Sequence, residues 1–294
     1  MAYGVMSFNS GVGNINMLPA TVNRYEPVTD GSSQMDMLFF SDFVQVPFST
    51  ASSSSGGLLY GANANGGSYT VNSTTDYAAI GVDACIGVLR CATGTTNNNT
   101  GYAAIKTADA ILSGIPTPTS GYVTKYEWEC LVETDASIFG ATRNGAIRFG
   151  MMATTTNTAP TDGVYFEFLY DGTTNDTTWN VVFRKDGSQE RVNTTVTVAA
   201  NKLYRLYMCV EKDTSGTYTT TYKIKNVTDA TNTESTAAPS NAAVYYPAAT
   251  TDYMGVAFLV TKAGTATTNS TFVILDYMAA RIRRKLNREM VILG

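Results

Sequence analysis

Short runs of aromatic and β-branched residues are densest between residues 122 and 225 of the chain. Such residues fit a pleated, half-buried surface, and each run is closed by residues that favour turns. The pattern therefore predicts a series of β-strands with no long helix between them. The four clearest runs are Tyr122–Val132, Gly163–Tyr170, Trp179–Lys185 and Leu203–Glu211.

A turn signal joins two of the predicted strands. The dipeptide Asp186-Gly187 follows Trp179–Lys185, and a second extended run, Glu190–Val198, begins shortly afterwards. A two-residue Asp-Gly connection suits a type I′ turn, in which both central residues need positive φ. We expect these two strands to form an antiparallel hairpin.

Further strand signals flank this central region on both sides, and together they predict one large sandwich. Residues 1–36, rich in Gly, Asn, Ser and Met, are expected to form an extended N-terminal arm, and residues 287–294 a C-terminal tail. The low apolar content of Asp229–Asn241 predicts a loop. The expected fold class is all-β, an antiparallel β-sandwich over residues 37–286. The additional strands are expected at Leu38–Val46, Ile80–Cys91, Tyr102–Lys106, Tyr218–Lys225, Met254–Thr261 and Phe272–Arg283.

The composition narrows the possible functions. Charged residues make up only 15% of the 294 residues, the net charge is −4, and the chain contains no histidine. Nucleic-acid binding usually requires a basic domain, and histidine is the commonest general base and metal ligand. We therefore predict no nucleic-acid partner, no catalytic residue and no cofactor. The N-terminus lacks a signal-peptide pattern, and no stretch reaches the ~20 apolar residues that span a bilayer, so no membrane partner is expected either.

The four cysteines do not form a Cys-x-x-Cys pair. Cys130 and Cys209 lie among apolar residues of predicted strands and are expected to be buried free thiols. Cys85 and Cys91 are close enough in sequence to bridge a short loop. The alternative, that these two are also free, stays open.

The first predicted strand of the central region carries alternating residue types. Side chains alternate between the two faces of a strand, so Trp128 is predicted to enter the core, while Glu127, Glu129 and Glu133 share the opposite face. Same-face Cα atoms lie about 6.5–7 Å apart, which overlaps the carboxylate spacing of glycosidases. The simpler interpretation is a charged face in solvent, and we expect Glu129→Gln to leave the stability almost unchanged.

Three other groups are candidates for binding. Asp162, Asp171, Asn175 and Asp176 have the chemistry of a calcium site, although Asp-Gly pairs are also common turn formers. Tyr245 and Tyr246, in an Ala- and Pro-rich stretch, are a possible glycan contact or a packed pair. The basic residues near the C-terminus form either a solvated strand edge or a docking strip for an acidic partner. They are Arg281, Arg283, Arg284, Lys285 and Arg288.

Several stretches, in this order and spacing, resemble the concanavalin A-like lectin/glucanase sandwich found in virion proteins of tailed bacteriophages. The resemblance covers about residues 37–284 and implies a jelly-roll topology, with the first strand near residue 40 beside the last strand near residue 275. Glucanases of this fold share a Glu-x-Asp-x-x-Glu strand motif, which does not occur in this sequence. The stretches include Ser41-Asp42-Phe43, Tyr126-Glu127-Trp128-Glu129, Pro160–Phe168, Trp179–Val182, Val198–Asn201 and Leu203–Leu206.

The resemblance implies a structural protein of a phage virion, made in the host cytoplasm and located on the virion surface. The expected role is that of a capsid decoration or cement protein that stabilises the shell. The expected partners are capsid or tail subunits and further copies of the chain in a homotrimer. The alternative is a tail-attached receptor-binding protein that holds a host glycan. A polysaccharide hydrolase, the third reading, is disfavoured by the missing acid motif.

Overall fold

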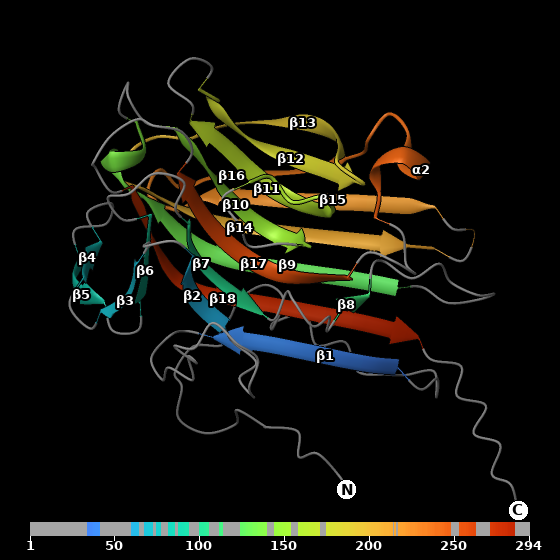
Figure 1. Ribbon diagram of the computed structural model, residues 1–294, viewed down its shortest axis with the longest axis horizontal. Coiled ribbons are helices and arrows are strands. Elements are labelled where there is room, and N and C mark those ends of the chain that lie inside the picture. Colours follow the sequence, from blue (N-terminus) through green and yellow to red (C-terminus); the bar gives the residue numbers. More distant parts are fainter. Residues whose placement is uncertain are drawn as a thin grey trace, which may run out of the picture.

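Two large antiparallel β-sheets make up most of the computed structural model (Figure 1). The structure describes residues 34–41, 60–64, 68–72, 75–77, 82–85, 88–93, 100–105, 112–113, 124–139, 144–153, 158–170, 175–213, 215, 217–247, 253–262 and 271–285. Residues 1–33 of the predicted arm and the predicted tail lie outside these ranges. The predicted fold class, an all-β antiparallel sandwich, is confirmed.

The first sheet, called sheet A, has eight strands. The last strand, β18, pairs with two strands in succession along its length. Its first part, Phe272–Leu275, pairs with β6, and its second part, Met278–Lys285, pairs with β1 (Gln34–Ser41). In spatial order the other strands are β16 (Thr231–Ala237), β15 (Tyr218–Asn226), β14 (Lys202–Lys212), β9 (Thr124–Thr134), β18 (Phe272–Lys285), β6 (Val88–Ala92) and β3 (Ser68–Asn72).

The second sheet, sheet B, also has eight strands, and a separate two-stranded ribbon pairs β4 (Thr75–Tyr77) with β5 (Val82–Cys85). The short strand β8 (Leu112–Ser113) pairs with one end of β17. In spatial order the other strands of sheet B are β13 (Ser188–Thr197), β12 (Thr178–Lys185), β11 (Gly163–Tyr170), β10 (Gly145–Met152), β17 (Tyr253–Lys262), β7 (Thr100–Ile105) and β2 (Tyr60–Ala64).

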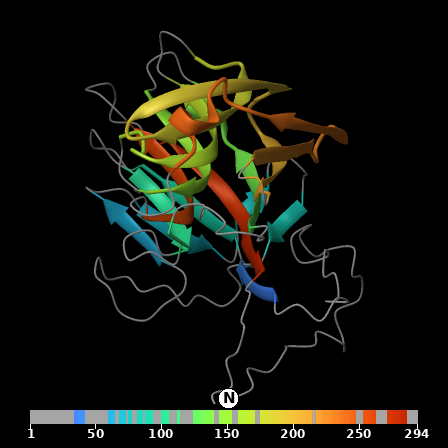
Figure 2. The ribbon, with the colours of Figure 1, turned by 90° about the vertical axis from the view of Figure 1, so that its right-hand side faces the viewer.

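Helical structure in the described residues is limited to two single turns. They are η2, a 3₁₀ turn at Ala136–Phe139 after β9, and α2, at Ala242–Tyr245 after β16. None of the described helices has the length and apolar character needed to cross a membrane. The side view of Figure 2 shows how far curved strands dominate the molecule.

The core lies between the two sheets and follows from the period-two alternation of each strand. Alternate residues of β9, such as Trp128, and of β12, such as Trp179, belong to one buried apolar cluster that takes side chains from both sheets. Trp179 packs edge to face against Tyr204 of β14, with ring centroids 5.9 Å apart, and so joins sheet B to sheet A. The prediction that Trp128 is a core residue is confirmed.

Two predicted pairings are also confirmed. β12 and β13 form the expected hairpin, in which Lys185 faces Ser188, and both turn residues have positive φ, 49° at Asp186 and 80° at Gly187. The first described strand lies beside the last, with Ser41 opposite Met278. Figure 1 shows β1 and β18 side by side along one border of the molecule.

The structure corrects the prediction of a loop over Asp229–Asn241, because β16 occupies Thr231–Ala237 within it. This strand lies at the edge of sheet A, and among the described strands it pairs only with β15. Its side chains are mostly exposed, and only Ala237 enters the core. An edge strand that contributes one residue to the core needs no apolar alternation, so the sequence pattern contains no signal for it.

The structure also contains a central strand of sheet B, β10, that the sequence pattern did not predict. Glycine is depleted in strands, and β10 contains both Gly145 and Gly150. Gly150, with φ of 150°, faces Tyr165, and a Cβ added to it would lie 2.6 Å from the Tyr165 Cα. The glycine therefore permits a close approach of β10 and β11. It also weakens the strand signal in the sequence, because glycine is uncommon in strands.

We expect Trp128→Ala to lower the free energy of unfolding by about 3–5 kcal/mol, because it removes a large side chain from the interior and leaves a cavity. Urea denaturation followed by circular dichroism measures this loss. Val244→Ala, at an exposed apolar residue of α2, is the control and should change stability by no more than about 0.5 kcal/mol. Equal midpoints for the two variants would contradict the placement of Trp128 in the core.

Candidate functional site

The face of β9 that points away from the core carries three buried carboxylates. Glu127, Glu129 and Glu133 have exposed fractions of only 2%, 0% and 2%. The prediction of a charged face in solvent is therefore wrong. β9 lies between β14 and β18 in the middle of sheet A, and the long side chains of these neighbours close over it. A buried carboxylate requires charged or hydrogen-bonding partners, and the structure provides them.

Glu129 is held by one side chain from each neighbouring strand. Its Oε1 accepts a hydrogen bond from the Nε of Arg205 on β14 at 2.6 Å, and a second from the hydroxyl of Tyr277 on β18 at 2.5 Å. Burial, followed by the charge of Glu129, raises the pKa of Tyr277 well above its usual value. Tyr277 therefore remains a neutral donor, and Glu129 ties three strands together.

Glu127 lies two residues before Glu129, on the same face of β9. It accepts a hydrogen bond from the Tyr207 hydroxyl at 2.5 Å and lies 3.9 Å from the Nη1 of Arg281 and from the Nζ of Lys125. Arg281, predicted as part of a docking strip, is only 4% exposed. Its guanidinium lies beside Glu127 inside the protein, so a partner surface cannot reach it.

The structure places the other members of the basic strip at the end of β18. In the backbone pairing Arg283 lies opposite Lys125, Arg284 opposite Thr124, and Lys285 opposite Gln34. Arg288 lies outside the described residues. The strip therefore combines one buried arginine with a run of basic residues at a sheet corner.

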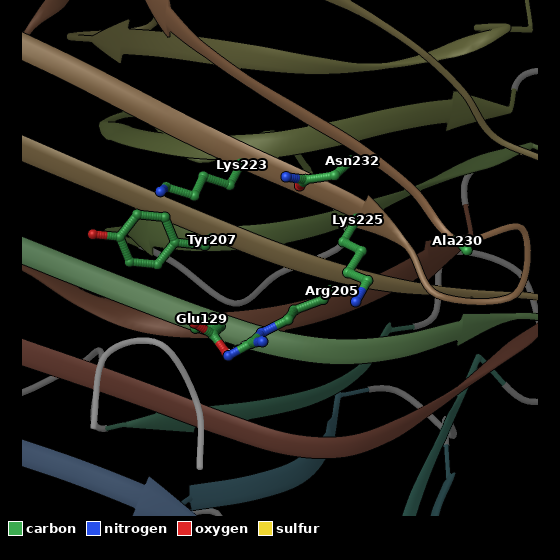
Figure 3. Close-up of a pocket in the computed structure, with 7 residues that line it drawn as sticks. All are labelled: Glu129, Arg205, Tyr207, Lys223, Lys225, Ala230 and Asn232. Carbon is green, nitrogen blue, oxygen red and sulfur yellow. Dashed lines mark hydrogen bonds and ion pairs between the residues drawn. The ribbon is translucent and has the colours of Figure 1, made fainter. Parts of the chain in front are cut away.

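A pocket of about 360 Å³ opens on the same outer face of sheet A (Figure 3). Its lining comes from four neighbouring strands: Glu129 from β9, Arg205 and Tyr207 from β14, Lys223 and Lys225 from β15, and Asn232 from β16, with Ala230 from the turn between β15 and β16. In the view of Figure 3 the Glu129–Arg205 pair lies along the lower edge, and Lys223 and Asn232 lie along the upper edge. The volume is at the lower end of the ~300–1,000 Å³ of ligand pockets.

The pocket is more basic than the chain as a whole. Arg205 and Lys225 are directly opposite in the β14–β15 pairing, and Lys223 is the next residue but one on the same face. Arg205 is balanced by Glu129, and Lys223 by Glu234 of β16, with Nζ and Oε1 2.7 Å apart. Lys225 is exposed and forms no ion pair with any other described residue. Lys225 is therefore an uncompensated cation of the pocket lining. It lies opposite Arg205, and like charges on directly opposite residues destabilise a sheet.

One carboxylate oxygen of the pocket also lacks a partner. Glu129 uses only its Oε1, and its Oε2 is buried without a hydrogen bond from any described residue. An unsatisfied buried acceptor is costly. With under 1 Å² of accessible surface, this oxygen is closed off from the pocket.

The outer face of sheet B carries a second buried ion network. The Nε of Arg148 lies 2.7 Å from Glu167 Oε2, and the Nε of Arg191 lies 3.1 Å from Glu167 Oε1. Arg191 also bonds Asp176, which accepts a backbone hydrogen bond from Leu169. Glu167 and Asp176 are thus both bound by arginine side chains.

This network includes one residue of the possible calcium site, Asp176. Another, Asp162, accepts a hydrogen bond from the Asp186 backbone at 2.8 Å and thereby supports the β12–β13 turn. Asp171 lies outside the described residues. Within the part of the chain that the structure describes, no three His, Cys, Asp or Glu side chains are grouped as metal ligands.

The predicted glycan contact at Tyr245 and Tyr246 is corrected for Tyr246, which is only 3% exposed. Its ring stacks on Tyr218 at 4.2 Å and meets Phe183 edge to face at 5.1 Å, and its hydroxyl lies 2.5 Å from that of Thr220. Burial is the main cause that raises the pKa of Tyr246 to about 12. Tyr245, in α2, is partly buried against the same cluster. The pair anchors α2 to the core, and the Tyr246 ring is not available to stack on a sugar.

The cysteines behave as buried apolar residues. Cys91, Cys130 and Cys209 are free and buried, which confirms the prediction for Cys130 and Cys209. Since Cys91 is free, the alternative of a Cys85–Cys91 bridge does not occur. Burial raises the pKa of both the Cys91 and the Cys209 thiol to about 12.

Comparisons with known proteins identify the fold. No family model and no curated protein matches the sequence. A protein of unknown function from Shewanella oneidensis MR-1 superposes with a TM-score of 0.56 at 12% identity, covering 86% of this chain and 89% of that chain. Peanut lectin, solved with a nine-residue peptide, gives 0.52 at 12% identity over 87% and 100% of the two chains. Basic winged bean lectin, solved with Tn-antigen, gives 0.51 at 13% identity over 84% and 98%. The chain therefore has the concanavalin A-like sandwich fold of legume lectins.

The sequence pattern did not predict the pocket. Arg205, Lys223 and Lys225 are separated by up to 20 positions from one another and by 76 to 96 positions from Glu129, and no motif links them. A signal does exist, because all four occupy polar positions of strands whose alternate residues enter the core. It becomes a site only when the order β9–β14–β15 is known.

We expect Glu129→Gln to lower the free energy of unfolding by about 1.5–3 kcal/mol, the usual contribution of a hydrogen bond to a charged group. The substitution keeps the shape but removes the charge that Arg205 and Tyr277 bind. Chemical denaturation measures the loss. The control is Glu234→Gln, which breaks an exposed ion pair with Lys223 worth about 0–1 kcal/mol. A Glu129→Gln midpoint equal to that of the unaltered chain would restore the prediction of a silent change.

Proposed function

We propose that this chain is a non-enzymatic structural protein of a bacteriophage virion, acting as a capsid decoration or cement protein that stabilises the shell. The observation that carries the proposal is the pairing of β1 with β18, in which Gln34 faces Lys285. The first and last described residues of the sandwich, Gln34 and Lys285, therefore lie at one corner of it. The resemblance to virion proteins of tailed phages supports the same role.

The engagement of the carboxylates supports the non-enzymatic part of the proposal. A glycosidase of this fold needs a pair of carboxyl groups free to act on the sugar. On β9 both Glu127 and Glu129 are bound by basic and tyrosine side chains, and on β11 Glu167 is bound by two arginines. These acidic residues stabilise the sheets, and this role suits a protein that bears mechanical load.

In a decoration protein the basic residues at the end of β18 would contact the acidic surface of a capsid subunit. Arg283, Arg284 and Lys285 lie at the same corner as Gln34, on a chain whose net charge is −4. Charge complementarity of this kind orients association and is weakened by salt. A homotrimer that presents three such corners would multiply the contact.

We expect a variant truncated after Leu286 to keep the sandwich fold, because β18 ends at Lys285, but to bind particles that lack the protein more weakly than the intact chain. Co-sedimentation with such particles at low and at high salt measures the difference. Lys185→Ala, which removes a cation from the β12–β13 hairpin instead, should bind like the intact chain. The truncation removes Arg288 and leaves Arg283, Arg284 and Lys285 in place, so full decoration by this variant at both salt concentrations would contradict a contribution of residues 287–294 to docking.

The second candidate function is a tail-attached receptor-binding protein that holds a host glycan. The pocket on the outer face of sheet A favours it, because a decoration protein has no need of a preformed pocket lined by basic side chains.

Copy number separates the two roles. We expect hundreds of copies of this chain per particle, measured by quantitative mass spectrometry against the major capsid protein of the phage that encodes it. A few to a few tens of copies would contradict the decoration role and support attachment to the tail.

A further inference from the structure

We infer that the β16 edge of sheet A is a docking surface for an extended, acidic segment of another protein. The segment would add a strand beside β16 and direct a carboxylate toward Lys225 of the adjacent pocket. Two separate observations lead to this partner, the open edge of β16 and the charge of the pocket. The inference concerns the purified chain, and it does not depend on where the chain sits in a virion.

The edge of β16 is regular and exposed. The strand pairs with β15 from Thr231 to Ala237 without a register shift, and all its residues except Ala237 are exposed or partly exposed. Proteins commonly close such an edge with lysine, proline or a bulge. The sequence of β16 contains neither residue, so its outer backbone N–H and C=O groups can pair with an added strand.

The described edge of sheet B differs in this respect. In the pairing of β12 with β13, Thr178 faces Thr197 but Asn180 faces Asn193, so β13 contains extra residues between these pairs. Thr195, within this interval, has a φ of 64°. A bulge of this kind bends an edge strand and interrupts its ladder. Of the two edge strands, β16 is therefore the one suited to strand addition.

The pocket beside β16 determines the charge of the partner. Its lining contains three cations, of which Arg205 is balanced by Glu129 and Lys223 by Glu234. Lys225 is exposed and forms no ion pair with another described residue. One positive charge therefore remains. A single carboxylate matches it, whereas a phosphate group would bring a charge of nearly two.

The strand pairing places the pocket within reach of an added strand. Arg205 faces Lys225, and Lys225 faces Asn232 of β16, so the three residues form one row across the sheet (Figure 3). A residue opposite Asn232 on an added strand would lie two strand spacings, each about 4.8 Å, from the backbone of Lys225. The side chains of a lysine and a glutamate together span this distance.

A second copy of the chain fits this surface less well. If two β16 strands paired antiparallel about Thr233, Glu234 of one copy would face Asn232 of the other. However, Glu234 is already bound by Lys223 of its own chain, with Nζ and Oε1 2.7 Å apart. Such a dimer would bring no free carboxylate to Lys225, so a different protein is the favoured occupant.

The test is titration of the isotopically labelled full chain with the capped peptide Thr-Thr-Thr-Glu-Thr-Thr-Thr, followed by NMR, which detects weak binding. We expect chemical-shift changes at the amides of β16. The peptide should bind roughly two- to fivefold more tightly than the same peptide with glutamine, the usual range for a cross-strand ion pair. A peptide whose backbone N–H groups are methylated should not bind, because it cannot donate the hydrogen bonds of a ladder.

Lys225→Gln should remove the preference for the glutamate peptide and leave the affinity for the glutamine peptide unchanged. Lys225 is exposed, so this variant is expected to fold normally. The matched control is Lys185→Gln, which removes the same charge from the β12–β13 hairpin and should keep the preference. Loss of the preference in both variants would show a general charge effect and overturn the inference.

Other results would also overturn it. These are absence of binding, shift changes confined to other strands, equal binding of the glutamate and glutamine peptides, and binding of the methylated peptide. A dimer of the chain alone that excess peptide converts to monomer in sedimentation experiments would identify a second copy as the occupant of the edge. None of these results would bear on the decoration role, which copy number tests.

Discussion

The structure depends on the position of β9 in the middle of sheet A, where both faces of one strand are buried. Trp128 belongs to the core between the sheets, while the adjacent Glu129 is equally buried on the outer face. A buried carboxylate is tolerated only with partners, and Arg205 and Tyr277 supply them from the two neighbouring strands. The apolar face thus holds the two sheets together, and the polar face fixes β14, β9 and β18 beside one another.

This double burial explains where sequence reasoning succeeded and where it failed. The inner face of each central strand was predictable because alternation with aromatic residues is a local signal, and the Asp186-Gly187 turn was predictable because its positive φ values require those residues. The environment of Glu129 was not predictable, because alternation shows only that its side chain lies on the other face of the strand from Trp128. Whether that second face meets solvent depends on neighbours 76 and 148 positions away.

The candidate site shows the same limit. Two residues that the sequence indicated for binding, Tyr246 and Arg281, are buried. Tyr246 stacks on Tyr218, and Arg281 lies beside the carboxylate of Glu127. Both residues stand out from their local sequence, Tyr246 as an aromatic residue in an Ala-rich stretch and Arg281 as a cation in a chain with few charges. The same aromatic and basic side chains also form the packing contacts and ion pairs of the protein interior. The pocket instead combines ordinary surface residues, such as Lys223 and Lys225, with one member of the buried network.

The network and the pocket share Glu129, and this sharing has a physical consequence. The carboxylate of Glu129, which binds Tyr277 on one side, also fixes the Arg205 guanidinium at the edge of the pocket. The interaction that aligns three strands therefore also sets the geometry of the pocket lining. A substitution at Glu129 must affect both the strands and the pocket, whereas one at the exposed Lys225, which no described residue balances, changes the charge of the pocket alone.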